Sequence, residues 1–512
     1  MYQKVQEFFS KKKVEVSAIV IVLAVFFVAS IVYGLNRSLS FDELEWTINF
    51  MDEGFFSMLE QLSTGLYNLP LFYILGYPIY NLFPHNEIWL YLPNILLSIA
   101  GFVFLYLFAK DFKNNVFAIC LLTVTVFNYS LLEYLVQFRP YALMLFLVCV
   151  FLFVWFKREK ENSPKNNVFY AIVSILLMYT HWFGSLFIVA FGVLDLIKIL
   201  KKIKPIKTIV PYIVMLTLFL PYFIMVILKS RYSIDYYWTD TASIAFGIEC
   251  VSVFLNCNIF SFVLFCVGAI FIVYFGYRYV FKKEEKENIG YLLFFILTIL
   301  LTFFVVQFYS LVINRNSSLC VFRYFLTLLP FINIVFLYGA KKVLDFIIVK
   351  KKEIVIVFTS VLFVVFSVPA NMVCIDQLKT VSNGYKQLVE YVLSQEDIKK
   401  ETTLVLATCG STWVDYYFVD KSKELPQNIV SSHLDVYFDN YFTQSVKNGK
   451  RIEDKKVEDI YTWILSFDKI YFYSESYKEL EKQKAFMDYV LENFDYKKTD
   501  IEYLSVFTKK GK

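Results

Sequence analysis

The chain has 512 residues, of which 58% are hydrophobic and 20% aromatic, and its formal net charge is +5. A composition this apolar excludes an ordinary soluble globular protein. The charged residues stand in short groups between uncharged stretches of about twenty residues, the length that crosses a bilayer. The excess of lysine is explained by membrane topology, so the net charge indicates no nucleic-acid partner.

Sequence motifs exclude further classes of protein. There is no Walker A sequence and no GxGxxG, so nothing indicates that the chain hydrolyses a nucleotide. Most of the 8 cysteines lie inside apolar runs. Because no CxxC pair occurs, neither a disulfide framework nor a zinc site is predicted.

The first apolar stretch, residues 17–35, follows three lysines at 11–13. It is longer than the core of a typical secretory signal peptide, and no convincing small-x-small cleavage site follows it. We therefore expect an uncleaved membrane anchor with the N-terminus in the cytoplasm.

The later basic clusters set the predicted topology. The positive-inside rule places loops rich in Lys and Arg in the cytoplasm, and about 11 spans put every such cluster on that side. The clusters lie at residues 11–13, 110–113, 157–160, 198–207, 282–286 and 341–352. The predicted spans cover residues 17–35, 92–109, 115–132, 139–156, 168–184, 185–200, 208–228, 260–280, 290–311, 324–340 and 353–372. The transmembrane domain, residues 1–372, therefore leaves the rest of the chain outside.

One apolar segment, residues 69–83, is not predicted to cross. It is short and contains Pro70 and Pro78, and a crossing here would move the next basic clusters to the outside. We expect a helix that lies in the membrane interface. The first outer loop, residues 36–91, is then long, and loops of that length are usually functional.

The tail, residues 373–512, is rich in Lys, Glu, Asp and Tyr. Helix-like segments at 385–395 and 475–492 alternate with strand-like ones at 403–408, 469–473 and 503–507. This pattern predicts a small α/β domain, placed outside the cytoplasm by the topology.

Ionisable residues at the outer ends of spans are the candidates for chemistry, because charges at membrane depth are costly. Asp42 and Glu43 follow the first span. Paired carboxylates of this kind could take a proton from an acceptor hydroxyl or hold a divalent metal, so the cofactor is left open. The alternative is a solvated loop with acidic residues at the start of a helix.

Three cationic or ionisable side chains mark other outer ends. Arg139 begins a span and could bind a phosphate by a bidentate contact, or serve only as a snorkelling anchor. His181 could be a ligand, a proton carrier or an interface anchor. Arg323 is a cation on the outer side, which suits a lipid phosphate or an ordinary anionic headgroup.

Short segments match, in chain order, those of a known family. They are Phe41-Asp42-Glu43, Asn68-Leu69-Pro70-Leu71-Phe72-Tyr73, Leu92-Pro93, Gln137-Phe138-Arg139-Pro140-Tyr141-Ala142-Leu143, Tyr179-Thr180-His181-Trp182-Phe183-Gly184, and Arg323-Tyr324-Phe325-Leu326 with Leu329-Pro330. With the α/β tail they resemble the bacterial membrane glycosyltransferases of the GT-C fold, a glycosyltransferase family 39-like group related to protein O-mannosyltransferases and the aminoarabinose transferase. The family often has an acidic residue where this chain has Gln137, and Arg where it has Tyr91; Glu133 lies one helical turn before Gln137.

The resemblance implies an α-helical polytopic membrane protein with an extracytoplasmic α/β domain. It implies transfer of a sugar from a polyprenyl-phosphate donor to an acceptor glycan, lipid or protein on the outer face of the cell membrane, with inversion. Asp42 would be the general base, oriented by Glu43. The substrate-binding residues would be Arg139, Gln137, Tyr141, His181, Arg323 and Tyr324, with the arginines at the phosphate.

Two other functions stay open. A transporter or flippase of lipid-linked sugars would share the apolar spans and the outward cations. It would leave the carboxylates of the first loop unexplained, and the two similar halves with interrupted helices that are common in transporters are not visible. A non-catalytic partner in the assembly of a cell-envelope polymer is the third possibility.

Overall fold

The structure is a computed structural model. It describes residues 12–64, 69–83, 86–229, 243, 245–282, 288–313, 319–347, 357–365, 367–368, 384–395, 403–408, 429–435, 441–447, 450–456, 460–473, 484–499 and 504–511. Contacts divide the chain into two compact units. The helical unit comprises residues 1–33, 54–79 and 88–374, and the sheet unit comprises residues 34–53, 80–87 and 375–512.

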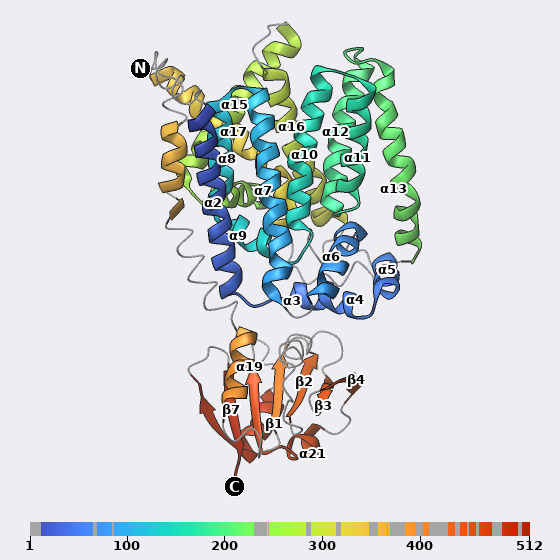
Figure 1. The fold of residues 1–512 in the computed structure, drawn as a ribbon, viewed down its shortest axis with the longest axis vertical. Helices are drawn as coiled ribbons and strands as arrows, with labels where there is room; N and C mark the ends of the chain where they lie inside the picture. Colours follow the sequence, from blue (N-terminus) through green and yellow to red (C-terminus); the bar gives the residue numbers. More distant parts are fainter. Residues whose placement is uncertain are drawn as a thin grey trace. The chain divides into compact units, whose positions relative to one another are not determined.

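Long apolar helices make this a multi-pass membrane protein. Within the described residues, 8 helices are long and apolar enough to cross a membrane, or up to 9 if a bent pair counts as one span. The long helices are α2 (Lys12–Asn36), α7 (Glu87–Phe112), α10 (Tyr141–Lys160), α12 (Trp182–Leu200), α13 (Val210–Lys229), α15 (Ile259–Lys282), α16 (Ile289–Phe308) and α17 (Leu329–Ile347) (Figure 1). On α2, Ile21 and Val28 are 62% and 59% exposed, as expected of side chains that face lipid rather than water.

Several predicted spans differ in detail from the structure. Residues 115–132 are not one straight helix, because α8 (Asn115–Val126) and α9 (Tyr129–Val136) meet at 70°. The predicted span 168–184 is the shorter helix α11 (Pro164–Met178). Of the predicted span 353–372, residues 357–365 and 367–368 are helical and the others lie outside the described residues. The total of about 11 spans stays a prediction.

Short helices connect the long ones. They are α3 (Phe41–Glu43), the π-helix η1 (Leu44–Ile48), α4 (Asn49–Asp52), α5 (Phe55–Thr64), α6 (Pro70–Leu82), η2 (Ile206–Ile209), α14 (Phe246–Phe254), the π-helix η4 (Tyr309–Ile313) and the 3₁₀-helix η5 (Phe322–Leu328). The segment predicted to lie in the membrane interface is α6, a separate short helix that begins at Pro70, where a missing backbone N–H costs nothing. Its position at an interface stays a prediction.

Aromatic rings fill the core of the helical unit. Phe191 on α12 lies 4.9 Å from Phe151 on α10 and 4.7 Å from Phe294 on α16, measured between ring centroids. Elsewhere the helix backbones approach closely: a Cβ added to Gly339 of α17 would lie 1.8 Å from the carbonyl oxygen of Leu264 on α15. Small residues that let backbones touch are typical of helix packing in membranes.

The sheet unit contains the α/β fold predicted for the tail. Its seven-stranded sheet has the order β4-β3-β2-β1-β5-β7-β6, with β1 parallel to both β2 and β5. The strands are β1 (Thr403–Thr408), β2 (Ile429–Asp435), β3 (Tyr441–Lys447), β4 (Lys450–Lys456), β5 (Lys469–Tyr473), β6 (Phe494–Lys498) and β7 (Leu504–Lys509), and the helices are α19 (Gly384–Ser394), α21 (Ile460–Ile464) and α23 (Lys484–Asn493). Leu404, Phe472 and Phe507 pack in its buried core.

Candidate active site

The turn that carries Asp42 and Glu43 is held by hydrogen bonds that run in both directions between Ser40 and Glu43. The backbone carbonyl of Ser40 accepts hydrogen bonds from the N–H groups of Glu43 and Leu44, at 3.0 and 3.1 Å. In return the Glu43 carboxylate accepts from the backbone N–H and the hydroxyl of Ser40, both at 2.8 Å. The reciprocal pair satisfies donors at the start of α3 that would otherwise lack partners.

Arg37 completes this turn. Its Nη1 donates to Glu43 Oε1 at 3.0 Å and its Nη2 bonds the other carboxylate oxygen. The two side chains are only 3% and 0% exposed. A buried ion pair is tolerated when further hydrogen bonds satisfy its atoms, and here Ser40 supplies them. Glu43 therefore fixes the turn, whereas its neighbour Asp42 is only partly buried.

The chain continues after Glu43 as the π-helix η1. Single π-helical turns are rare in proteins as a whole, but those that do occur are often found at functional sites. The buried side chains of Leu44 and Ile48, 0% and 1% exposed, anchor it. Sequence reasoning missed Arg37, although the Ser40-x-x-Glu43 spacing is itself a recognisable helix-start signal.

A second set of predicted residues converges in the helical unit. The guanidinium carbons of Arg139 and Arg323 each lie 5.9 Å from the ring centroid of Tyr141. The imidazole of His181 is 5.9 Å from the same ring and 5.2 Å from the ring of Tyr324. Segments far apart in the sequence thus bring two cations, two phenols and one imidazole together.

Helix starts position this cluster. Arg139 and Tyr141 flank Pro140, the N-cap of α10, and His181 is the N-cap of α12. Arg323 and Tyr324 lie in the first turn of η5. Backbone N–H groups and the positive end of the helix dipole meet at such starts, so the local field favours an anion.

The turn before α10 is braced by α7. Asn94 donates its side-chain N–H groups to the carbonyl oxygens of Gln137 and Arg139. Sequence reasoning missed Asn94, which directly follows the Leu92-Pro93 pair. Gln137 is 6% exposed, and within the described part of the chain its Oε1 and the hydroxyl of Tyr141 have no hydrogen-bond partner. Buried oxygens of this kind call for a ligand or water.

The matched segment around residues 69–73 packs against the same region. The N–H of Leu71 donates to the carbonyl of Tyr179 at 3.1 Å, and the rings of Phe72 and Phe138 lie 5.3 Å apart. The matched segments around residues 69–73, 137–143 and 179–184 are therefore neighbours in the helical unit, although they are far apart in the sequence.

His181 has an unusual electrostatic environment. Its Nδ1 accepts a hydrogen bond from the N–H of Phe183 at 3.2 Å. Burial, together with the nearby charges of Arg139 and Arg323, lowers the pKa of His181 to about 3. The imidazole is therefore neutral at physiological pH.

A different cluster joins the other ends of α10 and α12. Arg158 donates to Asp195 Oδ2 at 3.1 Å and to the carbonyl of Thr208 at 2.9 Å. Asp195 also accepts from Lys204 at 2.7 Å and from the hydroxyl of Tyr212 at 2.8 Å. These contacts satisfy the buried charges, so we assign the cluster a structural role.

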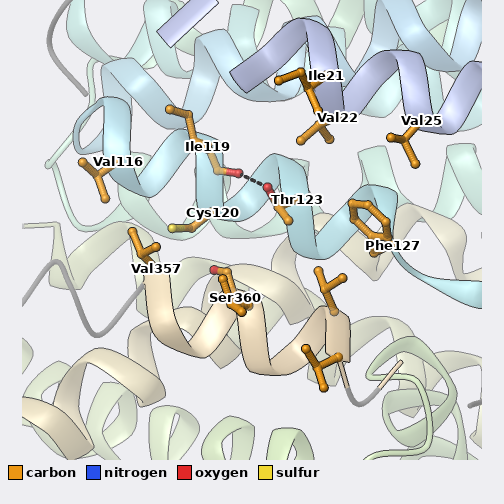
Figure 2. Close-up of a pocket in the computed structure, with 13 residues that line it drawn as sticks. Ile21, Val22, Val25, Val116, Ile119, Cys120, Thr123, Phe127, Val357 and Ser360 are labelled. Atoms are coloured by element: carbon orange, nitrogen blue, oxygen red, sulfur yellow. Dashed lines mark hydrogen bonds between the residues drawn. The ribbon is translucent and has the colours of Figure 1, made fainter. Parts of the chain in front are cut away.

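An apolar groove of about 310 Å³ lies between α2, α8 and the helical segment 357–365. Figure 2 shows Ile21, Val25 and Val357 lining it, with Thr123 bonded to the carbonyl of Ile119. Among the described residues, no charged side chain lines this groove. Within the same described residues, no group of three or more His, Cys, Asp or Glu side chains is arranged to hold a metal ion.

No protein-family model matches the sequence, and no curated protein sequence matches it. Among solved structures, the chain is similar to ArnT from Cupriavidus metallidurans in the apo state, with a TM-score of 0.52, 11% identity, and coverage of 95% of this chain and 97% of that one. ArnT bound to undecaprenyl phosphate gives a TM-score of 0.48 at 12% identity, again over 95% and 97% of the two chains. The archaeal oligosaccharyltransferase AglB from Archaeoglobus fulgidus gives 0.44 at 11% identity, over 80% of this chain and 64% of that one. The likeness to ArnT over nearly the full length of both chains confirms the GT-C fold expected from the motifs.

Proposed function

We propose that the chain is a membrane glycosyltransferase that moves a sugar from a polyprenyl-phosphate-linked donor to an acceptor hydroxyl on the outer face of the membrane. The main support is that the guanidinium groups of Arg139 and Arg323, at the starts of α10 and η5, both lie near the ring of Tyr141. A GT-C fold without a nucleotide-binding motif suits a donor activated by a lipid phosphate. The fold shared with ArnT supports this class of reaction.

The leaving group sets the role of the cations. The acceptor oxygen forms a bond to the anomeric carbon while the bond from that carbon to the phosphate oxygen breaks. The phosphate leaves with the bonding electrons, so its charge grows from that of a diester to that of a monoester. Arg139 and Arg323 bind this phosphate, and fixed cations aimed at developing charge are usually the largest catalytic contribution.

The acceptor proton goes to Asp42 in the proposed reaction. General-base catalysis contributes roughly 10²–10⁴-fold in typical cases. Glu43 acts through position rather than proton transfer, because Arg37 and Ser40 already occupy its carboxylate. Direct displacement of this kind inverts the anomeric carbon, so the product anomer is itself a check on the proposal.

The buried oxygens near the cations are assigned to the donor. Gln137 Oε1 accepts a hydrogen bond from a sugar hydroxyl, and the hydroxyl of Tyr141 donates to a phosphate oxygen. Both groups are buried and have no partner in the described residues, so a bound donor would satisfy them. The ring of Tyr324 lies 5.2 Å from the imidazole of His181, with the two ring planes tilted by 47°, and it would form part of the same donor site.

The test uses purified full-length protein with radiolabelled polyprenyl-phosphate sugars as donors and lipid extract from native membranes as the acceptor source. Wild type should transfer label, and Asp42→Asn should lose transfer while keeping its unfolding temperature. Arg139→Gln should lose transfer and also bind the donor more weakly. Equal transfer by wild type and Asp42→Asn would remove Asp42 from the mechanism.

One observation favours the transporter reading. The helix pair α8 and α9 is bent by 70°, and interrupted helices at membrane depth are frequent in transporters. A transporter would move a lipid-linked sugar across proteoliposomes without any acceptor. If the wild type moves the donor but never forms a product, the transferase proposal is wrong.

A further inference from the structure

His181 is held in one tautomer by its own backbone environment. It is the N-cap of α12, with extended backbone at φ −159° and ψ 144°. Its Nδ1 accepts the N–H of Phe183 at 3.2 Å. A ring nitrogen that accepts an N–H carries no proton, so the proton of the neutral ring lies on Nε2.

The groups that surround the imidazole come from three elements. The rings of Tyr141 on α10, Phe183 on α12 and Tyr324 on η5 lie 5.9, 5.8 and 5.2 Å from it. The charges that act on it are those of Arg139 and Arg323, and both oppose a third positive charge. In the described part of the chain, Nε2 has no hydrogen-bond partner.

We propose that His181 is a specificity-determining residue that donates a hydrogen bond from Nε2–H to an oxygen of the lipid phosphate, and that it selects the dianionic monoester over the diester. The inference rests on the proposed function, since it assigns the ligand of the same site. Two guanidinium groups carry a charge of +2, which matches a phosphate monoester. The imidazole adds a hydrogen-bond donor without adding charge. Its bond to the phosphate is therefore strongest when the leaving phosphate acquires its second negative charge, and it stabilises that state most.

Two variants separate this role from simple capping. His181→Asn keeps a short acceptor for the N–H of Phe183, because Asn is a good N-cap, but it removes the distal donor. His181→Gln carries an amide N–H out toward the position of Nε2, but it is a poor cap. A purely structural histidine predicts that Gln is the damaging change, whereas our proposal predicts that Asn is.

The experiment measures binding of farnesyl phosphate and of its methyl diester to the purified full chain, by calorimetry in detergent at pH 8. Wild type should bind the monoester more tightly than the diester. His181→Asn should weaken monoester binding by about 10-fold or more, as expected for a lost hydrogen bond to a charged group, and should bring the two affinities together. His181→Gln should recover most of the preference, even though its unfolding temperature falls.

The outcomes distinguish the inference from the function beneath it. If Arg139→Gln abolishes binding while His181→Asn leaves the preference unchanged, the role of His181 is refuted and the phosphate site stands. If the wild type binds neither ligand, both proposals are wrong. The ratio of wild-type to His181→Asn affinity for the monoester should also be the same at pH 7.5 and pH 9, because over this range the monoester stays dianionic and the imidazole stays neutral. A ratio that falls as the pH rises would mean a protonated donor and would refute the neutral one.

Discussion

Removal of Arg37 tests how the turn that carries Asp42 is held. In Arg37→Gln the Glu43 carboxylate would stay buried and keep the two donors of Ser40, but it would lose its guanidinium counter-charge. Breaking a buried ion pair by removing one partner costs about 3–5 kcal/mol. Solvent screens this pair little, because the two side chains are only 3% and 0% exposed. The lower figure corresponds to an opening of the turn that is roughly 100-fold more frequent.

Carbodiimide labelling measures this opening in the intact protein. The reagent couples an amine to accessible carboxylates, and fragmentation mass spectrometry separates the adjacent Asp42 and Glu43. In the wild type, Asp42 should react and Glu43 should be protected. In Arg37→Gln, the rate at Glu43 should rise by about 100-fold, toward that of Asp42.

Arg37→Lys is the matched control, because it keeps the charge but cannot make the two parallel bonds of a guanidinium. It should give an intermediate rate at Glu43. Equal labelling of Asp42 and Glu43 in the wild type, or no change on removal of Arg37, would refute the reasoning that Glu43 is a structural carboxylate.

Three further predictions concern catalysis and packing. Asp42→Asn should lower sugar transfer by roughly 10²–10⁴-fold with an unchanged unfolding temperature; a parallel loss of stability would mean that the carboxylate is structural. Gly339→Leu should abolish folding of the membrane region, because a Cβ there lies 1.8 Å from the carbonyl oxygen of Leu264, and size-exclusion chromatography of the detergent extract would show it; a monodisperse variant would contradict the packing. Asp195→Asn should lower the thermal aggregation midpoint by several degrees, because it leaves Arg158 buried without its counter-charge, at a cost of about 3 kcal/mol or more; an unchanged midpoint would show that the cluster adds no stability.

The fold class follows from the sequence because the lengths of apolar runs encode it directly. The backbone N–H and C=O groups of a segment inside a bilayer must be hydrogen-bonded internally, as they are in a helix. Each long uncharged run therefore predicts a transmembrane helix. The sequence also singled out the residues that the structure brings together in the helical unit, although their roles stay predictions. Arg139, His181 and Arg323 each lie at the start of a helix that follows a loop. The other residues of the group were selected because they belong to segments that match the family in chain order.

The break between α8 and α9 was not predictable, because residues 115–132 contain no charge, glycine or proline. Asn128 caps α9 locally by accepting from the N–H of Ser130 at 3.1 Å, and tertiary contacts satisfy other backbone groups at the break. Asn128 donates to the carbonyl of Phe254 at 2.7 Å, and Asn256 donates to the carbonyl of Phe127 at 2.9 Å. The long-range partners lie more than a hundred residues away, so the single asparagine cap was too weak a local signal to predict the break. The strand β4, Lys450–Lys456, was missed for a related reason, because its KRIEDKK sequence lacks an apolar alternation.

The two candidate groups differ in how they are held, and the difference fits the work proposed for each. A phosphate that gains charge is stabilised best by cations that are already in position. Arg139 and Arg323 lie at the starts of helices that belong to a unit whose core is packed with aromatic rings, which would hold them in place. A base must instead meet an acceptor of variable shape, which suits a short turn in a long loop. Such a turn would be too loose for proton transfer if left to itself. The bonds of Arg37 and Ser40 to Glu43 remove that freedom, while the neighbouring Asp42 is only partly buried.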